Sequence, residues 1–307
     1  MFVIQKMSHD LLLDEKVIKS ICAREQANYR RIKLPKGRIV WQPCAQLKSL
    51  QYWVADFLLE NGVDPLPCAT AYEVGSSIAN NAKVHKKNNH VLRMDIRHFF
   101  PSITRDSISK YLSTVKCQVP LEKDDIDFIC AVVCKQGSLV MGSPSSPMLA
   151  NRIMIPVDQK IQDSLSEYGQ PFCYTRYSDD LFISSKHFID TEIADQIESI
   201  LMGYGFRINR SKTKFLGKGS NRMMAGIAIN QNKELSLGQK RKAQLRKALY
   251  DFCITQKPSQ EQAYSLQGLI AFSRSIKPKY VSKMLVKYSS YCDEPILKKM
   301  KRCIKCP

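Results

Sequence analysis

The spacing of apolar residues along this chain predicts helices and short strands that alternate. Apolar positions recur at a helical spacing over residues 3–28, 46–59, 122–134, 148–166 and 193–202. Runs of β-branched and aromatic residues predict strands at 91–96, 172–176 and 181–184, a basic hairpin at 29–41 and further short strands within 206–230. From Leu237 onward the pattern is helical again, and Pro258, Pro278 and Pro295 mark the expected breaks.

The composition is that of a folded protein with room for about two domains. Of its 307 residues, 44% are hydrophobic and 24% are charged. No apolar run approaches the roughly 20 residues that cross a bilayer, and the first residues do not form a secretory signal. Eleven scattered cysteines, an odd number, favour a reducing cytosol, so we expect a cytoplasmic protein. Cys303 and Cys306 have the spacing of half a zinc site, which no second such pair completes.

Positive charge is concentrated in the last third of the chain. Residues 1–208 hold 25 Lys and Arg against 23 Asp and Glu, whereas residues 209–307 hold 22 against 5. A solvated basic helix face is the alternative explanation for such an excess. However, self-repulsion of this size destabilises a compact domain unless something offsets it, so an anionic polymer is the favoured partner. Phosphate neutralisation by Lys and Arg makes that polymer a nucleic acid.

Two adjacent acids, Asp179 and Asp180, follow Tyr177 and Ser178 between two predicted strands, at the expected tip of a hairpin. A polar turn is one explanation for the tetrapeptide. A divalent cation is the other, because adjacent buried carboxylates repel and hard oxygen ligands suit Mg²⁺. Asp95 ends a mostly apolar predicted strand and is followed by Phe99-Phe100-Pro101. Three carboxylates on neighbouring strands can hold the two metal ions used in phosphoryl transfer.

Six blocks of residues occur along the chain in a defined order. They are Arg38–Pro43 with Leu47-Lys48 and Gln51; Ala71-Tyr72 with Gly75, Ile78, Asn81-Ala82 and His85; Arg93–Ile103; Gly142–Asn151; Tyr177–Asp180; and Gly205–Thr213. Together they resemble the blocks of reverse transcriptases, and most of all those of the bacterial retron reverse transcriptases. The resemblance extends from about Arg38 to Tyr288.

Three positions depart from the pattern of that family. Ser178 stands where the family usually has Ala before the two aspartates. Met141 stands where a Gln often precedes the glycine of the fourth block. Met224-Ala225-Gly226 replaces the Val-Thr-Gly that retron enzymes often carry.

The resemblance implies an α+β right-hand polymerase with fingers, a palm of antiparallel sheet plus helices, and a helical thumb. It places the N-terminal part of the fingers at residues 1–90, the palm with the remaining fingers elements at 91–232, and the basic helical thumb at 233–307. It implies that Asp95, Asp179 and Asp180 are the catalytic metal ligands, together with the backbone carbonyl of Ile96. The expected cofactor is Mg²⁺, as two ions that Mn²⁺ can replace.

The resemblance also implies a set of contacts to the incoming nucleotide, from Arg38, Lys36, Phe100, Gly142, Ser143 and Lys212. Phe100 corresponds to the residue beneath the sugar, where an aromatic ring clashes with a 2′-hydroxyl and favours deoxynucleotides. Lys212 corresponds to a general acid for pyrophosphate. Core packing for Phe100, a solvated hairpin face for Lys36 and a plain surface position for Lys212 remain open.

Basic residues at near-helical spacing in the last third predict contacts with an A-form duplex, and they are Lys240, Arg241, Lys242, Arg246, Lys247, Lys277, Lys279 and Lys283. The expected function is that of an RNA-directed DNA polymerase that copies a dedicated structured noncoding RNA, primed by an RNA 2′-hydroxyl, to give a branched RNA–DNA. The resemblance further implies deoxynucleotide substrates, a defence effector protein encoded nearby and an anti-phage role, with no membrane partner. The alternatives are a bacterial reverse transcriptase without a retron RNA, or a non-catalytic RNA-binding scaffold.

Overall fold

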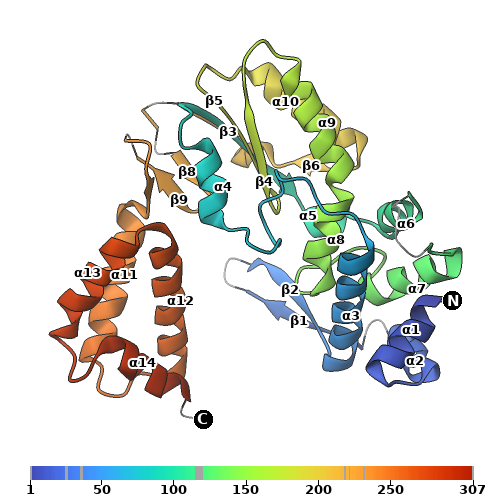
Figure 1. Ribbon diagram of the computed structural model, residues 1–307, viewed down its shortest axis with the longest axis horizontal. Coiled ribbons are helices and arrows are strands. Elements are labelled where there is room, and N and C mark those ends of the chain that lie inside the picture. Colours follow the sequence, from blue (N-terminus) through green and yellow to red (C-terminus); the bar gives the residue numbers. More distant parts are fainter. Residues whose placement is uncertain are drawn as a thin grey trace. The chain divides into compact units, whose positions relative to one another are not determined.

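The chain divides into two compact units, each made of segments that lie far apart in the sequence. The structure is a computed structural model, which describes residues 2–24, 27–34, 37–114, 120–217, 219–220, 222–230 and 232–305 (Figure 1). One unit comprises Met1–Ser76 and Leu92–Phe215, and the other comprises Ser77–Val91 and Leu216–Pro307. Within the described residues, no helix combines the length and apolar character needed to cross a membrane.

The first unit begins with two helices and a hairpin rather than one long helix. The elements are α1 (Phe2–Leu11), α2 (Glu15–Ala23), β1 (Tyr29–Lys33), β2 (Ile39–Pro43) and α3 (Ala45–Asn61). The helix predicted over residues 3–28 is interrupted because Leu12 has a positive φ of 53° and Asp14 caps α2, its side chain accepting from the backbone of Lys16 at 2.6 Å. The predicted basic hairpin is confirmed, with Tyr29 opposite Pro43.

A sheet and its covering helices make up the rest of the first unit. Its elements are β3 (His90–Arg97), α5 (Phe99–Ser102), α6 (Arg105–Thr114), α7 (Lys123–Val133), α8 (Ser145–Ile153), α9 (Ile155–Ser166), β4 (Cys173–Tyr177), β5 (Asp180–Ser185), α10 (Thr191–Gly203), β6 (Arg207–Ile208), the 3₁₀ turn Arg210–Lys212 and β7 (Lys214–Leu216). The strand order is β4-β5-β3-β6, and β7 also pairs with β3. Helices α9 and α10 lie against one face of this sheet (Figure 1). The same hydrophobic core joins Ile161 of α9, Ile183 of β5 and Ile197 of α10.

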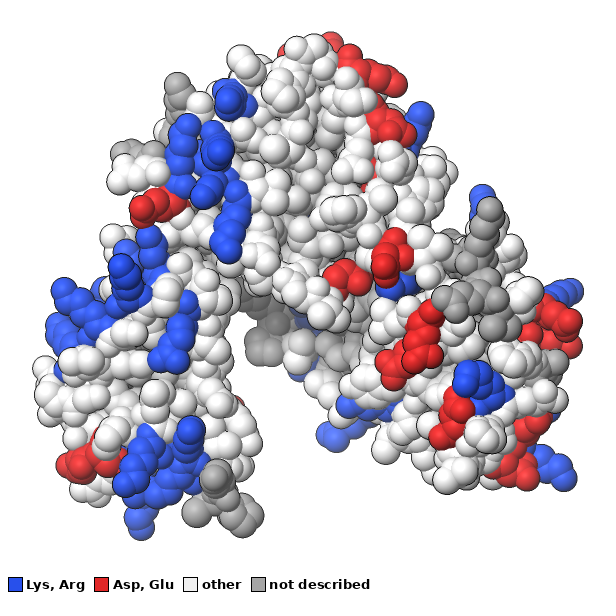
Figure 2. Space-filling model, in the orientation of Figure 1, with Lys and Arg blue, Asp and Glu red and all other residues white. Residues whose placement is uncertain are grey.

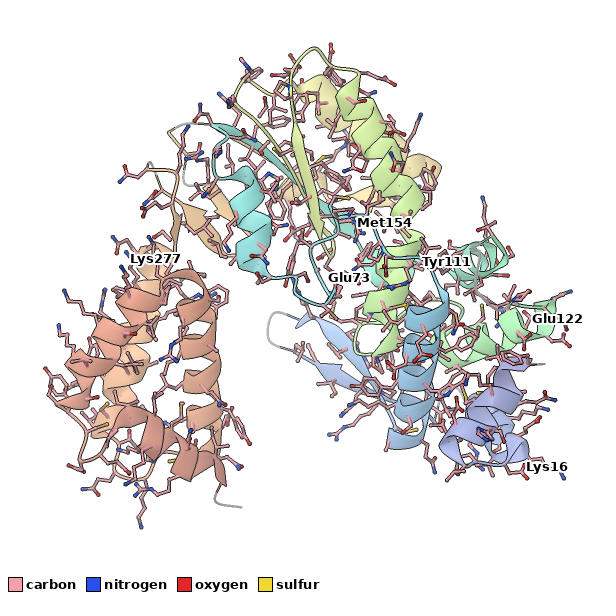
Figure 3. The ribbon with its side chains drawn as sticks, in the orientation of Figure 1. Lys16, Glu73, Tyr111, Glu122, Met154 and Lys277 are labelled. Atoms are coloured by element: carbon pink, nitrogen blue, oxygen red, sulfur yellow. The ribbon has the colours of Figure 1, made fainter. Side chains whose placement is uncertain are left out.

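The helix predicted over residues 148–166 is two helices. Met154 ends α8 and precedes α9 (labelled in Figure 3). Pro156 occupies the first turn of α9, where a missing N–H costs no hydrogen bond. This break lets the buried residues of both helices, such as Leu149 and Ile161, face one core.

The second unit combines a small sheet with a helical bundle. Its elements are α4 (Ile78–His85), β8 (Arg222–Met224), β9 (Ile227–Ile229), β10 (Leu235–Ser236), α11 (Gly238–Ile254), α12 (Gln260–Ile276), α13 (Pro278–Ser289) and α14 (Ile296–Lys305). Helix α4 contacts all three strands of the β10-β9-β8 sheet. Buried residues of the four C-terminal helices, among them Leu249, Leu266, Val281 and Met300, form a separate core.

The breaks predicted at the three prolines are confirmed. Helix α11 ends before Pro258, α13 begins at Pro278 and α14 begins directly after Pro295. At the C-terminal end of α4, His85 is fully buried, and this burial lowers its pKa to about 3. The imidazole is therefore neutral in the folded protein, which fits a structural hydrogen-bonding residue.

Candidate active site

The sheet brings the three predicted acids together from two distant parts of the chain. The backbone N–H of Ile96 donates to the carbonyl of Asp179 at 2.8 Å, which places the end of β3 beside the β4–β5 turn. Tyr177 pairs with Asp180 in the hairpin, so Ser178 and Asp179 form its two-residue tip. Asp95 is only 6% exposed, whereas Asp179 and Asp180 are half-buried. The pairing of β3 with the β4–β5 hairpin therefore brings the three predicted acids to neighbouring positions of one sheet.

Cationic side chains hold two of these carboxylates. The Lys212 ammonium donates to Oδ1 and Oδ2 of Asp95 at 2.8 and 2.9 Å. The Arg93 guanidinium donates to both oxygens of Asp180, with its Nη2 at 2.9 Å from Oδ1 and 3.2 Å from Oδ2. Sequence reasoning placed Arg93 in a motif but gave it no role. An arginine within an apolar strand, two residues before an acid, was the available signal.

Burial raises the pKa of both turn acids, and the acids also act on one another. For Asp179, burial is the largest cause; the negative charge of Asp95 raises its pKa further, while Lys212 and Arg38 lower it. For Asp180, burial is again the largest cause of the raised pKa. Arg93 lowers this pKa, and the charges of Asp179 and Asp95 raise it further. The charge of Asp95 therefore acts on both turn acids, and the charge of Asp179 acts on Asp180, as expected for neighbouring carboxylates.

The chemistry of these donors suits a hard divalent cation, because all three acids offer carboxylate oxygens. Within the described part of the chain, no three or more Asp, Glu, His or Cys side chains are grouped so that they could hold a metal ion. Asp95 and Asp180 instead point their oxygens at Lys212 and Arg93. The Ile96 backbone lies beside Asp179, with its N–H donating to the Asp179 carbonyl.

A buried network supports the turn that carries the two acids. Arg176, which is fully buried, donates to both carboxylate oxygens of Asp158, the shortest bond being 2.7 Å. Its Nη1 also donates to Oδ1 of Asn151 at 3.0 Å, and the Tyr174 hydroxyl donates to Asp158 at 2.7 Å. Sequence reasoning missed this network. Its visible signal was a charged residue inside an apolar pattern, Asp158 in the helix and Arg176 in the strand. The network fixes β4 up to the residue before Tyr177.

The residues predicted to contact nucleotide lie on several elements of the first unit. Phe100 is 8% exposed on α5, with its ring centroid 5.4 Å from that of Phe99. Arg38 is exposed at the start of β2, and its charge reaches Asp179. Lys36 lies outside the described residues. Lys212 is brought to the acids, as described above.

The loop before α8 explains why Gly142 is a glycine. Its φ is 113°, and a Cβ there would lie 2.6 Å from the backbone oxygen of Trp41. The adjacent Met141 carbonyl accepts from the backbone N–H of Trp41 at 2.8 Å. Ser143 is buried, and its hydroxyl lies 3.0 Å from that of Ser145. The β1–β2 hairpin and this loop are therefore in direct backbone contact.

The predicted basic residues of the second unit lie on α11, on α13 and at the residue before α13. Arg241 stacks on the Phe272 ring of α12 at 4.9 Å, while Lys242 lies 5.5 Å from the Tyr280 ring of α13. The Arg246 guanidinium reaches the Tyr280 hydroxyl at 3.4 Å. Lys240 and Lys247 belong to the same helix, Lys279 and Lys283 to α13, and Lys277 forms an ion pair with Glu234 at 2.8 Å. Figure 2 shows Lys and Arg gathered over this unit.

A groove of about 640 Å³ runs between α11 and α12. Arg241, Lys247, Tyr264 and Phe272 line it, and Gly268 leaves it open because a Cβ there would meet nothing within 4 Å. Cys303 packs against the helical core of the same unit, and Cys306 lies outside the described residues.

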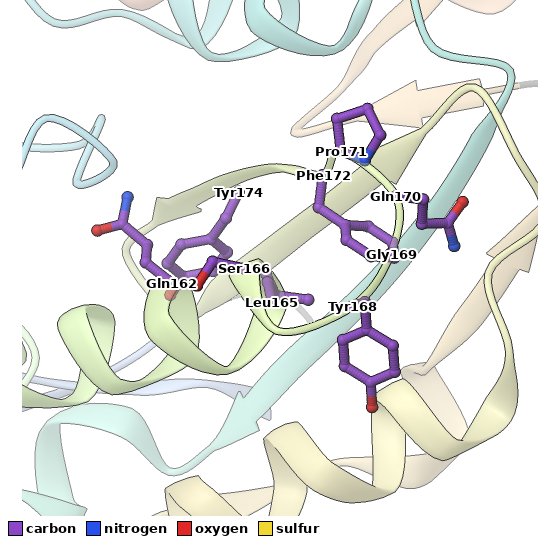
Figure 4. Close-up of a pocket in the computed structure, with 9 residues that line it drawn as sticks. All are labelled: Gln162, Leu165, Ser166, Tyr168, Gly169, Gln170, Pro171, Phe172 and Tyr174. Carbon is purple, nitrogen blue, oxygen red and sulfur yellow. The ribbon is translucent and has the colours of Figure 1, made fainter.

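A second cavity, of about 490 Å³, lies at the loop between α9 and β4 (Figure 4). Its walls include Leu165, Tyr168, Phe172 and Tyr174, and none of the three acids lines it. No charged side chain contributes to it, so it lacks the groups that phosphoryl chemistry needs.

Comparison with known proteins shows the family of this chain. Residues 17–243 match the family described as Reverse transcriptase (RNA-dependent DNA polymerase). The chain belongs to this family. It is 30% identical over 280 residues to the retron Ec83 reverse transcriptase of Escherichia coli, covering 87% of this chain and 88% of that one. It is also 30% identical over 260 residues to the retron Ec86 reverse transcriptase of the same organism, covering 82% and 78%.

The protein is thus a retron reverse transcriptase, and so an RNA-dependent DNA polymerase, as the sequence motifs indicated. An apo telomerase from Candida tropicalis has a similar fold, with a TM-score of 0.50 at 9% identity over 95% of this chain and 67% of that one. The predicted α+β polymerase fold is confirmed. Membership of the family implies catalysis with divalent metal and binding of a nucleic acid template and product.

Two departures from the usual reverse transcriptase residues have visible structural settings. Ala225 and Gly226, with φ of 45° and 90°, form the two-residue turn between β8 and β9. Such turns require positive φ at both central residues, which Gly tolerates best. At the other departure, Met141 contributes its backbone carbonyl to Trp41, and its side chain is 38% exposed.

Proposed function

We propose that this reverse transcriptase copies a dedicated structured noncoding RNA into DNA, with Asp95, Asp179 and Asp180 holding two Mg²⁺ ions that Mn²⁺ can replace. The observation that supports the proposal is the backbone hydrogen bond from Ile96 to Asp179, which joins β3, directly after Asp95, to the turn that carries Asp179 and Asp180. Synthesis starts from a 2′-hydroxyl of the RNA and leaves a branched RNA–DNA. The product serves an anti-phage system with a nearby effector protein.

The side chains around the acids have distinct roles in this proposal. When bound, the divalent ions supply activation of the attacking hydroxyl and stabilise charge on the leaving pyrophosphate. Lys212, half exposed and hydrogen-bonded to Asp95, donates a proton or hydrogen bond to the pyrophosphate. Arg38 attracts the triphosphate, with Lys36, Gly142 and Ser143 completing that contact. Phe100 excludes ribonucleotides.

The substitution Asp179→Asn tests the metal-holding role. It removes a charge but keeps the shape of the side chain, so deoxynucleotide incorporation should be abolished while RNA binding persists. Asp195→Asn, at an exposed acid on α10, is the matched control and should keep full activity. Equal polymerisation by the Asp179→Asn variant and the control would exclude Asp179 from the reaction centre.

Sequencing the nucleic acid that copurifies with the protein from its host tests the RNA assignment. The expected species is one RNA covalently joined to DNA through a 2′,5′ linkage, which debranching treatment cleaves. Recovery of RNA with no attached DNA, or of unselected cellular RNA, would contradict a dedicated template. Loss of phage protection when Asp179→Asn replaces the wild-type gene would link synthesis to defence.

The basic helices of the second unit are proposed to bind that RNA through Lys240, Arg241, Lys242, Arg246, Lys247, Lys277, Lys279 and Lys283. Support comes from the charge of this unit and from the groove between α11 and α12, which joins cations to aromatic rings. Gly268→Leu fills the groove without a clash, and Leu favours a helix by about 1 kcal/mol over Gly.

We therefore expect Gly268→Leu to weaken binding of a labelled RNA hairpin at least about fivefold, as loss of aromatic stacking does. The unfolding temperature should not fall. Gly203→Leu, at an equally open position that ends α10, is the control and should bind normally. Unchanged RNA affinity in Gly268→Leu would remove the groove from the proposal.

A further inference from the structure

Two residues with left-handed backbone conformation meet at the catalytic turn. Tyr72 has φ of 65° and Ser178 has φ of 59°, and their hydroxyl oxygens share a hydrogen bond of 2.9 Å. Non-glycine residues adopt this conformation at a cost, and persist in it where surrounding contacts determine it. Ser178 directly precedes Asp179 and Asp180, so its conformation sets the direction in which both acids leave the turn.

The chain on either side of Tyr72 is tied to the buried network below the turn. The amide of Asn151 donates to the carbonyl of Ala71 and to the Glu73 carboxylate, both at 2.7 Å. One residue earlier, the backbone N–H of Thr70 donates to the carbonyl of Arg176 at 2.8 Å. Glu73, labelled in Figure 3, therefore ends a segment held at three residues, on both sides of Tyr72. This leaves the Tyr72 backbone with little freedom.

The same network leaves the tip of the turn less supported. Arg176 donates to the carbonyl of Ser178 at 3.4 Å, a long contact beside its bonds of 2.7–3.1 Å to Asp158. The side chain of Ser178 is buried, and Tyr72 is the partner of its hydroxyl. Tyr72 itself is half exposed, so its ring is not a core residue. Its hydroxyl is thus the side-chain contact that reaches the tip from an anchored segment.

We infer that Tyr72 is a positioning residue for polymerisation, which acts through Ser178 to hold Asp179 and Asp180 in the direction needed for metal binding. The inference rests on the proposed roles of those two acids. A turn with alanine at residue 178 has no hydroxyl for such a contact, so the device depends on Tyr72 and Ser178 as a pair. Removing either hydroxyl should let the tip sample other conformations.

A double-mutant cycle with Tyr72→Phe and Ser178→Ala tests the inference. Each single change should lower kcat roughly three- to tenfold, the equivalent of one hydrogen bond, with KM for deoxynucleotide altered less than about twofold. The double variant should be no slower than the slower single variant, because both changes remove the same contact. Mn²⁺ affinity, measured from the electron paramagnetic resonance of free Mn²⁺, should fall by a similar factor.

The matched control is Tyr52→Phe, because Tyr52 is 51% exposed where Tyr72 is 50% exposed. Wild-type kcat and Mn²⁺ affinity in Tyr72→Phe would overturn the inference, as would additive losses in the double variant. A fall in unfolding temperature and RNA affinity that tracks kcat would also overturn it, by showing a general structural role. If Asp179→Asn is inactive while Tyr72→Phe is normal, only this inference fails. If Asp179→Asn is active, the proposed function fails.

Discussion

The ammonium of Lys212 lies against both carboxylate oxygens of Asp95, at 2.8 Å from Oδ1 and 2.9 Å from Oδ2. It thereby offsets part of the repulsion among three neighbouring acids and lowers the pKa of Asp179. Arg93 does the same for Asp180. Two cations, each paired with one carboxylate, thus offset part of the negative charge of the three acids.

Replacing Lys212 by Gln should slow incorporation about tenfold or more, the scale of a lost general acid. It should also move the acidic limb of the pH–rate profile to higher pH. Lys212 lowers the pKa of Asp179, so its removal raises that pKa, and the required carboxylate then protonates earlier as pH falls. Rates measured between pH 5 and 8 check this, with exposed Lys214→Gln as control. An unshifted acidic limb would contradict the electrostatic role.

Shortening Phe100 should open the enzyme to ribonucleotides. The side chain is 8% exposed and packs on Phe99, so Phe100→Ala also costs about 3–5 kcal/mol of stability as a large-to-small change. The measurement is therefore the ratio of deoxynucleotide to ribonucleotide incorporation, well below the unfolding temperature. A lower ratio supports a steric gate. The same ratio in a folded variant would assign Phe100 to packing alone.

Breaking the buried Arg176–Asp158 pair should strongly destabilise the first unit. Both side chains are fully buried, so Arg176→Met leaves the Asp158 charge uncompensated, at a cost of about 3–5 kcal/mol. Changing Asp158→Leu in the same chain removes that charge and should recover part of the loss. Urea unfolding of the wild type, the single and the double variant provides the comparison. A double variant less stable than Arg176→Met would show that the uncompensated charge of Asp158 is not the main cause of the lost stability.

His85 should make the second unit sensitive to acid. Burial lowers the pKa of this imidazole to about 3, against roughly 6.5 in an unfolded chain. Above pH 6.5, His85 is neutral in both the folded and the unfolded chain, so its contribution to the free energy of unfolding does not change with pH. As pH falls below 6.5, His85 binds a proton in the unfolded chain but not in the folded protein. The free energy of unfolding therefore drops by about 1.4 kcal/mol per pH unit until pH 3. His85→Gln should flatten the pH dependence of the unfolding free energy. An unchanged slope would show that other groups dominate.

The sequence predicted the three acids and most elements because both depend on local patterns. Apolar, β-prone runs flank Asp179 and Asp180, and proline positions marked the end of α11 and the starts of α13 and α14. The interruption at Leu12 was missed, because apolar periodicity continues across a single residue with positive φ. Local pattern also cannot show which cation meets which acid. Arg93 and Lys212 find their partners only through the sheet, across 87 and 117 residues of chain.

The strand order β4-β5-β3-β6 has a consequence for how the enzyme folds during its synthesis. The β4–β5 hairpin forms from adjacent residues, but β3 must insert beside it from far upstream, and β6 and Lys212 follow later still. Closing such long loops is entropically costly and slow relative to local structure. A nascent chain therefore carries Asp95 on the ribosome well before a working centre exists. Asp95 and Lys212 can pair only when residue 212 has emerged and the sheet has formed.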